Sequence, residues 1–435
     1  MFFRRADGIA LLLLTTALAG CGAGSTITNA PSPSGVAATA TPDAGNSAGP
    51  TPSPSAPASA TPAPPATATP TPAPTATARP SASPVPTATP SAGTFSLSKI
   101  KHVFIVVLEN ESYSSTFAAN PPAPYLAKTL PAQGALLEDY YSTGHASLDN
   151  YITLISGQAP SYDTQTDCQD YLDFQLIAVV IDGQAAGAGC VFPTSVPNIT
   201  DSITAKGLTW KGYEQDMGND PTRETATCGH PVLNTQDQTQ SATATDQYAT
   251  RHDPFMYFHT IIDNPICNKD SVNFTHVVPD LSSIATTANF SVFTPNLCND
   301  GHDSPCASGQ AGGLPQINTF LLGFIPSIVN SPAYKQDGLL LITFDEAAET
   351  DGSSCCGELP GPNSADPGLT GLGGGVVGMV ALSRYIKPGT ISMMPYNHYA
   401  TLKTIEDAFG LPLLGYSQTS GLSDYSSDIF TNPGG

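Results

Sequence analysis

Two polar pairs directly follow two of the most apolar segments of the chain. Glu109-Asn110 comes after HVFIVVL (102–108), and Asp345-Glu346 comes after LLLITF (339–344). Unbroken apolar runs of this length are typical of parallel strands that are covered on both faces. In an open α/β sheet, ligands bind just beyond the carboxyl ends of the strands. If the two strands are parallel, we expect these four side chains to converge at one edge of the sheet.

Carboxylates gathered in a small space repel one another and raise each other's pKa unless a cation lies between them. A hard divalent metal ion is the natural occupant of such an oxygen-rich site. The simpler interpretation is that Glu109 or Asp345 only caps or solvates the end of its strand. Two such strand ends in one chain favour a metal site, although the sequence does not identify the metal.

A serine stands at the start of a segment with a helical pattern. In GHASLDNY (144–151), Ser147 precedes 148–156, and Gly157 is placed to end that helix. As an N-cap residue, Ser147 would need no further role. A hydroxyl at this position also faces the exposed N–H groups and positive dipole end of the helix, which favour a phosphate or a serine alkoxide. Position alone leaves both interpretations open.

Three histidines lie in segments that contain other polar residues. His252 lies in RHDPF (251–255) and His302 in NDGHD (299–303), whereas His398 precedes a second helical pattern that Gly410 is placed to end. A single histidine is more often a surface residue or a hydrogen-bonded core residue than a catalyst. On sequence position alone, these residues are candidates and no more.

The elements that must position these residues alternate along the chain. Further short apolar segments at 208–213, 290–294 and 376–382 are predicted strands, and the helices are predicted at 148–156 and 399–409. This alternation predicts an α/β fold built as a layered helix–sheet–helix domain. The part from 94 to 435 shows no second linker or internal repeat, and its length allows one large core.

The N-terminal part has a different composition. Two arginines precede a short apolar segment (9–19), and small residues then lead to Cys21, which is the layout of a secretory signal too short to span a membrane. LAGC (18–21) resembles the lipobox of bacterial lipoproteins, which implies cleavage after residue 20 and a lipid on Cys21. The alternative is an ordinary secretory signal in which this cysteine is incidental.

Residues 24–93 consist almost entirely of Pro, Ala, Thr and Ser and hold 17 of the 41 prolines. Such a segment cannot bury apolar surface, and it predicts a disordered, partly polyproline-like stalk. The predicted organisation is a signal peptide (1–20), a lipidated cysteine with its stalk (21–93) and a globular domain (94–435). The protein is therefore expected outside the cytoplasm, anchored to the membrane of the cell envelope through Cys21.

The charge of the chain is strongly acidic. The 15 Lys and Arg residues and 36 Asp and Glu residues give a formal net charge of −21. Three of these basic and two of these acidic residues precede residue 94, so the predicted domain carries −22. Such a surface attracts neither nucleic acid nor anionic lipid, and we expect no nucleic-acid partner.

Eight of the nine cysteines remain once Cys21 is set aside. An even number of cysteines in an exported chain indicates disulfides, although eight residues allow 105 connectivities. Only a Cys298–Cys306 bridge is favoured by spacing alone, because it closes a short loop. No C-x-x-C pair is present, which disfavours a metal–thiolate site.

Taken together, these stretches resemble the bacterial and fungal phosphoesterase family of acid phosphatases and phospholipases C, in the alkaline-phosphatase-like superfamily. Many short motifs in the family's order are more specific than any one of them. The matching segments are HVFIVVLENESYSSTF (102–117), HASLDNYITLISG (145–157), GLTWKGYEQDM (207–217), HDPFMYF (252–258), FTPNLCNDGHD (293–303), LLLITFDEA (339–347), VVGMVALSRYIKPGT (376–390) and YNHYATLKTIEDAFGLPLLG (396–415).

The resemblance implies an alkaline-phosphatase-like fold and assigns roles to individual residues. It implies that Ser147 is the nucleophile and that Asp149 stands where many relatives have Pro. His252 and His302 match positions that hold the substrate phosphate or protonate the leaving group. His145 and His398 are further candidates, at positions where members differ. The implied ligands of a divalent metal ion are Glu109, Asn110, Ser147, Asp345 and Glu346.

We therefore predict metal-dependent hydrolysis of phosphate esters through a phosphoserine intermediate on Ser147. The substrate is expected to be a phosphorylated small molecule, and NDGHD and NHY resemble the acid-phosphatase branch, which favours monoesters. Protonation of His302 or His252 would favour activity under mildly acidic conditions. The alternatives are a phospholipase C or other phosphodiesterase and, in a different class, a non-catalytic surface binding protein stabilised by calcium.

Overall fold

An eight-stranded sheet forms the centre of residues 95–435, the part of the chain that the structure, a computed structural model, describes. The predicted signal peptide, Cys21 and the stalk lie outside the described residues. The strand order is β11-β2-β10-β9-β1-β8-β6-β7. The strands are β1 (His102–Leu108), β2 (Ala135–Leu137), β6 (Trp210–Glu214), β7 (Ser271–Asn273), β8 (Phe290–Thr294), β9 (Gly338–Phe344), β10 (Met379–Ser383) and β11 (Thr390–Ser392).

The strand directions confirm the central prediction from the sequence. Strand β1 pairs in parallel with β9 on one side and β8 on the other, and its register with β9 sets Leu108 opposite Phe344. The two polar pairs therefore leave the sheet side by side. The sheet is mixed rather than purely parallel, because β10 runs antiparallel to both β9 and β2.

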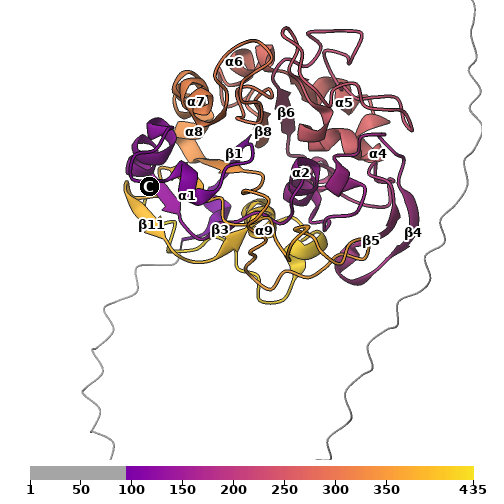
Figure 1. Ribbon diagram of the computed structural model, residues 1–435. Coiled ribbons are helices and arrows are strands. Elements are labelled where there is room, and N and C mark those ends of the chain that lie inside the picture. The colour runs from indigo at the N-terminus through magenta and orange to yellow at the C-terminus, as the bar shows by residue number, and fades with distance from the viewer. Residues whose placement is uncertain (1–94) are drawn as a thin grey trace, which may run out of the picture. The chain divides into compact units, whose positions relative to one another are not determined.

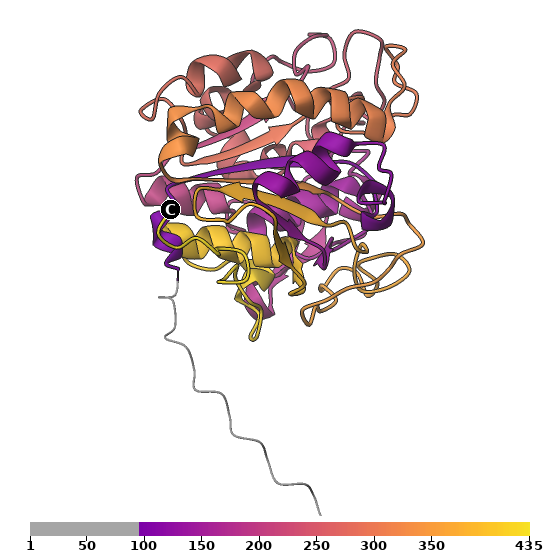
Figure 2. The same ribbon diagram turned by 90° about the vertical axis from the view of Figure 1, so that its left-hand side faces the viewer.

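Helices cover both faces of the sheet, which confirms the predicted layered α/β fold. Figure 2 shows the long helix α7 (Gly313–Val329, orange) above the sheet and α9 (His398–Phe409, yellow) below it. Helix α2 (Ser147–Ser156) packs against α9, and α8 (Pro332–Asp337) packs against β9 and β1 (Figure 1). The shorter helices are α1 (Tyr113–Thr116), α3 (Ile199–Ala205), α4 (His259–Ile262), α5 (Ile266–Asp270) and α6 (Val277–Asp280).

Aromatic side chains fill the two interfaces between sheet and helices. On the α7 face, Phe293 of β8 stacks on Tyr213 of β6 with ring centroids 4.9 Å apart and meets Phe324 of α7 at 5.3 Å. On the other face, Trp210 of β6 stacks on Phe255 at 4.7 Å. Gly212 permits this approach, because a Cβ there would lie 2.6 Å from the Phe255 ring. These contacts fix the segment that follows His252.

Several predicted boundaries differ from those observed. Helix α2 begins at Ser147 itself and its N-cap residue is Ala146, so the interpretation of Ser147 as an N-cap is wrong. Gly157 (φ 67°) and Gly410 (φ 63°) end α2 and α9 in the left-handed region, as predicted. Strands β6 and β10 begin two and three residues later than predicted, because the preceding residues lie in turns and loops.

Two small sheets complete the described part. Strand β3 (Tyr140–Tyr141) pairs with β12 (Tyr396–Asn397), and β4 (Gln175–Val179) forms a hairpin with β5 (Ala185–Ala188).

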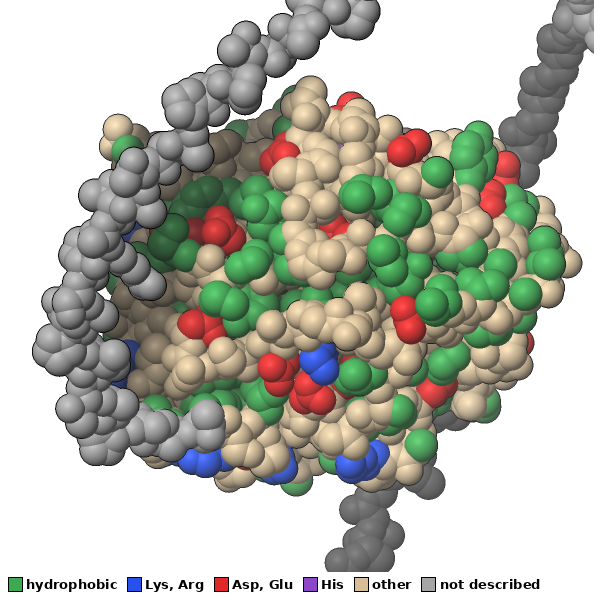
Figure 3. All heavy atoms as spheres, turned by 90° about the horizontal axis from the view of Figure 1, so that it is seen from below, with side chains coloured by type: hydrophobic (Ala, Val, Ile, Leu, Met, Phe, Trp, Pro, Cys, Tyr) green, Lys and Arg blue, Asp and Glu red, His purple; other side chains and the backbone are tan. Residues whose placement is uncertain are grey.

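Within residues 95–435, no helix is both long enough and apolar enough to cross a membrane. On the face seen in Figure 3, carboxylate side chains are spread over the surface, and Lys and Arg side chains lie along the lower rim and near the middle of the face.

All eight cysteines of the described part are paired. The predicted Cys298–Cys306 bridge is present, and the others are Cys168–Cys190, Cys228–Cys267 and Cys355–Cys356. The prediction of a disulfide-bonded domain is therefore confirmed. The last bridge joins two adjacent residues, a pairing that spacing did not favour over the other connectivities.

Candidate active site

The carboxyl ends of β1 and β9 bring Glu109 and Asp345 to one edge of the sheet. The amide of Asp345 donates to the carbonyl of Leu108 (2.9 Å), which extends the ladder beyond the last strand residues. The amide of Asn110 donates to Oδ1 of Asp345, also at 2.9 Å. The predicted convergence of the two strand ends is therefore observed.

Helix α2 holds both carboxylate oxygens of Glu109. The hydroxyl of Ser147 donates to Oε2 (2.8 Å), and the phenol of Tyr151 donates to Oε1 (2.7 Å). Residues four apart share one face of a helix, so one turn of α2 presents both hydroxyls to the same carboxylate. Glu109 is fully buried and Ser147 nearly so. Tyr151 was not among the residues predicted from the sequence, although its i, i+4 spacing from Ser147 was a usable signal.

A third acidic residue, Asp300, completes a compact cluster. Its Oδ2 lies 3.2 Å from Nδ1 of His252, and Nε2 of His252 lies 3.5 Å from Oε2 of Glu109. One possible ligand atom from each of Glu109, His252 and Asp300 lies within 4.8 Å of the other two, the one such group found among residues 95–435. Asp300 lies in the NDGHD segment, of which the sequence analysis selected only the histidine.

Burial disfavours the ionised forms of the carboxyl groups at this edge of the sheet unless a cation balances their charge. Burial raises the pKa of Glu109 well above its usual value, and the charges of Asp345 and Asp300 raise it further. Burial likewise raises the pKa values of Asp300 and Asp345. Oδ2 of Asp345 is buried and has no hydrogen-bond partner within the described residues. A cation at this edge would relieve both problems.

His252 has the character of a metal ligand rather than of a cation. Burial lowers its pKa well below the usual value, and the neighbouring Arg251 and His302 lower it further. A neutral imidazole nitrogen beside carboxylate oxygens is a donor set suited to a divalent metal ion. The side chains on this edge therefore fit the predicted metal.

Arg251 and His302 supply positive charge and a proton-bearing group near the cluster. Nη2 of Arg251 lies 3.1 Å from Nε2 of His302, and Nδ1 of His302 lies 2.9 Å from Oδ1 of Asp303. Because a guanidinium only donates, Nε2 accepts and the ring proton lies on Nδ1. The rings of His302 and His252 are 5.7 Å apart. Arg251 is buried, and the sequence analysis assigned it no role.

Glu346 and His145 form a separate pair beside this cluster. Nδ1 of His145 lies 3.3 Å from Oε2 of Glu346, and Nε2 donates to the carbonyl of Asp351 (2.9 Å). Glu346 is not part of the compact group formed by Glu109, His252 and Asp300. The structure thus places this predicted ligand next to the cluster, with its carboxylate toward an imidazole.

The remaining predicted residues, Asn110 and His398, differ in their burial. Asn110 is exposed, and its side-chain amide donates to Oε2 of Glu109 (3.2 Å). His398 is fully buried, and Nε2 donates to the carbonyl of Phe344 (3.3 Å), beneath the end of β9. Burial lowers the pKa of His398 to about 3. This histidine supports the strand end and is not brought into the cluster.

Asp149, which the resemblance singled out, lies buried in the first turn of α2. Neither of its carboxylate oxygens has a hydrogen-bond partner within the described residues. Burial and the charges of Glu346 and Asp167 raise its pKa well above the usual value. The side chain packs on Gly144, where a Cβ would lie 2.3 Å from Oδ1 of Asp149. Glycine at 144 therefore makes room for the acid.

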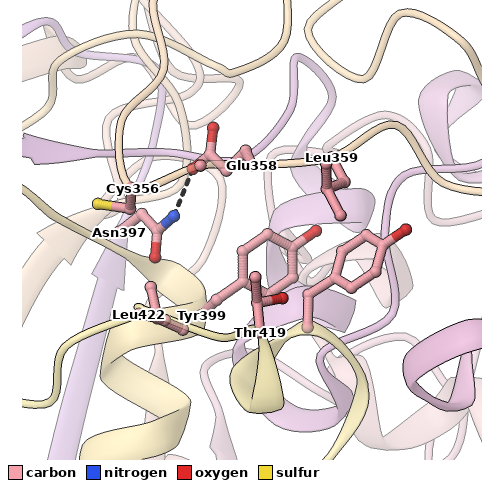
Figure 4. A pocket seen from close by; sticks show the side chains of 9 residues that line it. Cys356, Glu358, Leu359, Asn397, Tyr399, Thr419 and Leu422 are labelled. Carbon is pink, nitrogen blue, oxygen red and sulfur yellow. Dashed lines mark hydrogen bonds between the residues drawn. The ribbon is translucent and has the colours of Figure 1, made fainter.

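The pocket in Figure 4 lies apart from these residues. Nine residues line it, among them Glu358, Asn397 and Tyr399, and Glu358 accepts a hydrogen bond from the side chain of Asn397. Its volume of about 10 Å³ is room for roughly one water molecule. None of Glu109, His252, Asp300 and Asp345 lines it, and we assign it no catalytic role.

Comparisons with known proteins identify the family of the chain. A profile of the Phosphoesterase family matches residues 119–412. The phosphate-repressible acid phosphatase of Penicillium chrysogenum is 25% identical over 286 residues, covering 66% of this chain and 54% of the relative. The phosphatidylinositol-3-phosphatase of Mycobacterium tuberculosis is 25% identical over 322 residues, covering 74% of this chain and 81% of the relative.

The chain spans a little over half the length of the acid phosphatases it matches. Among solved structures, an alkaline phosphatase superfamily protein from Vibrio parahaemolyticus aligns with a TM-score of 0.42 and 11% identity. That alignment covers 73% of this chain and 69% of the other.

Proposed function

Because this chain belongs to the phosphoesterase family, we propose that it is a metal-dependent, acid-phosphatase-like hydrolase of phosphate esters with Ser147 as its nucleophile. One observation supports this above all. The Ser147 hydroxyl lies 2.8 Å from Glu109, inside a cluster of buried carboxylates and a neutral histidine at the carboxyl edge of the sheet. A hydroxyl in such a setting is suited to nucleophilic attack on phosphorus.

Glu109, His252 and Asp300 would hold the metal ion, with the free Oδ2 of Asp345 beside them. When bound, the ion supplies positive charge that lowers the pKa of a nearby hydroxyl and balances charge developing on the phosphoryl group. The ligand set inferred from the family shares Glu109 and Asp345 with this arrangement. The family's ligand set also includes Asn110, Glu346 and Ser147, and their role as metal ligands stays a proposal.

Individual residues of the chain have separate roles in the transfer of the phosphoryl group and its hydrolysis. The Ser147 oxygen passes its proton to Oε2 of Glu109, which accepts its hydrogen bond (2.8 Å), and forms a bond to phosphorus as the bond to the leaving oxygen breaks, which gives a phosphoserine. Water then attacks the phosphoserine, and the serine hydroxyl is restored as phosphate departs. Arg251 and the N-terminal end of α2 offer positive charge to the phosphoryl oxygens. His302, at the rim, is the proposed source of the proton for the leaving group when its ring carries a second proton on Nε2 in place of the hydrogen bond from Arg251.

We place His145 and His398 in supporting roles. Nδ1 of His145 lies 3.3 Å from Oε2 of Glu346, and Nε2 donates to the carbonyl of Asp351. His398 bonds the last carbonyl of β9, one residue before Asp345. Both histidines therefore help to orient the segment after β9 that carries Asp345 and Glu346.

We also propose that the enzyme works outside the cytoplasm. Four disulfides support this, because such bridges persist in oxidising compartments. The proposed arrangement is the one expected from the sequence, with a signal peptide over 1–20, a lipidated Cys21 with its stalk to 93, and the catalytic domain over 94–435. Labelling with a fatty-acid analogue, lost on Cys21→Ser substitution, tests the anchor.

Turnover of p-nitrophenyl phosphate by the purified full chain, with and without EDTA, tests the function. Ser147→Ala should abolish turnover, whereas Ser282→Ala, at an exposed serine after α6, should not. Undiminished turnover by the Ser147→Ala variant contradicts the assigned nucleophile. Faster hydrolysis of bis-p-nitrophenyl phosphate than of the monoester would favour the phosphodiesterase alternative. Metal-loaded protein that hydrolyses neither ester would favour the binding-protein alternative.

A further inference from the structure

A cavity of about 510 Å³ opens beside the proposed active site. Its walls come from the segments that follow β1 and β9, together with Val376 before β10. The residues that matter here are Ser112, Tyr113 and Ser114 from the first segment, and Ala348, Thr350 and Asp351 from the second. The volume is in the range of sites that bind small organic molecules.

The two segments that line the cavity start at the catalytic edge and are bonded to each other. Ser112 accepts a hydrogen bond from the amide of Ala348 (3.0 Å), which ties the two segments together. Ser112 lies three residues after Glu109, and Ala348 three after Asp345, so each is within about 10 Å of its acidic partner along the chain. This distance suits the part of a substrate next to its phosphate.

A second connection runs to the segment of the nucleophile. The carbonyl of Asp351, in the cavity wall, accepts the hydrogen bond from His145, which lies two residues before Ser147. The wall is therefore fixed relative to the proposed nucleophile as well as to the proposed metal ligands.

The lining offers hydroxyl groups and an aromatic ring. The side-chain hydroxyls of Ser114 and Thr350 bond no other residue within 95–435, so they are available to a ligand. Tyr113, the first residue of α1 (Figure 1), is half-buried and lines the cavity, with its ring stacked on that of Phe117 (centroids 5.0 Å apart). Such a surface can bond the hydroxyls of a polyol or pack against an alkyl ammonium group.

The charge around the cavity is negative. None of its lining residues is Lys, Arg or His, and Asp351 is one of them. Burial raises the pKa of the Tyr113 phenol to about 12, and the charges of Glu138 and Asp139 raise it in the same direction. A second anionic group on a ligand would meet these carboxylates without a compensating cation.

We propose that this cavity binds the leaving group of the phosphate ester and selects polyol or amino-alcohol groups over groups that carry a further negative charge. This inference rests on the proposed phosphatase function. It adds to that function a specificity site and a class of substrate.

The charge preference is tested with three esters of similar size and the metal-loaded full chain. The value of kcat/KM should be at least about 10-fold lower for phosphoglycerate than for glycerol phosphate, and phosphoethanolamine should match or exceed glycerol phosphate. Thr350→Lys should reduce this difference, because it adds a cation to the lining, whereas Thr286→Lys at a remote exposed site should not. Equal or faster hydrolysis of phosphoglycerate by the unaltered protein overturns the proposal.

Filling the cavity is an independent test. Ala348→Trp should raise the KM for glycerol phosphate about 10-fold and leave the inhibition constant of inorganic phosphate within about twofold, because free phosphate lacks the leaving group. Ala285→Trp, at an exposed site elsewhere, is the matched control. Turnover with an unchanged KM overturns this inference alone. No turnover of any ester, p-nitrophenyl phosphate included, overturns the proposed function and this inference with it.

Discussion

The phenol hydroxyl of Tyr151 donates a 2.7 Å hydrogen bond to Oε1 of Glu109. The other oxygen of that carboxylate accepts from Ser147, one turn earlier on the same helix. The proposed nucleophile and the orientation of a proposed metal ligand are therefore set by one rigid element. Because Glu109 is fully buried, no water can replace either hydroxyl without a rearrangement of α2.

We expect Tyr151→Phe to weaken both metal binding and catalysis. The variant keeps the ring, which stacks on His252 at 5.4 Å, and removes only the hydrogen bond to Glu109. Loss of a partner that orients a metal ligand lowers metal affinity or activity by roughly 10- to 100-fold. Titration with the metal and measurement of kcat check this. Tyr334→Phe on α8 is the control, and equal behaviour of the two variants would exclude the orienting role.

Asp300→Asn tests the acidic residue that only the structure revealed. The substitution keeps the size of the side chain and removes a negative charge from the cluster, so retained metal after dialysis should fall at least about 10-fold. Asp303→Asn, three residues further on, should retain the metal. Metal analysis of both variants and of Glu346→Gln then decides which acids are ligands. Full metal retention in Asp300→Asn would remove it from the set.

Gly212→Ala is expected to destabilise the fold and disturb the site together. Its Cβ would lie 2.6 Å from the ring of Phe255, so the segment that carries His252 must shift, at a cost of about 1–3 kcal/mol. Gly323→Ala in α7 is the opposite case, because nothing lies within 4 Å of the added carbon. It should stabilise the helix by about 0.5–1 kcal/mol. Thermal unfolding compares the two, and a Gly212→Ala variant as stable as the parent would contradict the packing argument.

Glu406 gives a pH dependence of stability that can be isolated. Burial raises its pKa from 4.5 to about 8 in the folded state, where Ser417 donates to Oε2 (2.6 Å) and Leu414 to Oε1 (3.0 Å). Between these pH values the unfolded chain releases the proton first. Each pH unit of increase therefore lowers the free energy of unfolding by up to about 1.4 kcal/mol.

Glu406→Gln removes this dependence. Its amide oxygen can still accept from Leu414, and its NH2 group can donate to the Ser417 hydroxyl, which rotates to accept. The melting temperature of the variant relative to the parent should therefore rise from pH 5 to pH 8 and level off above pH 8. Asp407→Asn, at the exposed neighbouring position, should show no such trend. A constant difference between Glu406→Gln and the parent across this range would show that Glu406 is ionised in the folded protein.

The sequence by itself determined the features that depend on local pattern. Apolar runs identified β1 and β9, and the acids directly after them had to lie at the strand ends, because the chain cannot place them elsewhere. Glycines at 157 and 410 marked the helix ends, since a left-handed residue is easiest for glycine. The even number of cysteines indicated disulfides, although not their pairing.

Tertiary structure decided which polar side chains meet. Asp300 joins the cluster only because β8 lies next to β1, and Tyr151 because α2 packs with one face toward Glu109. The direction of β10 and the pairing of Cys355 with Cys356 were likewise open. These features depend on contacts between residues far apart in the chain or on loop geometry. No local pattern of residue types encodes such contacts, because many packings satisfy the same hydrophobic periodicity.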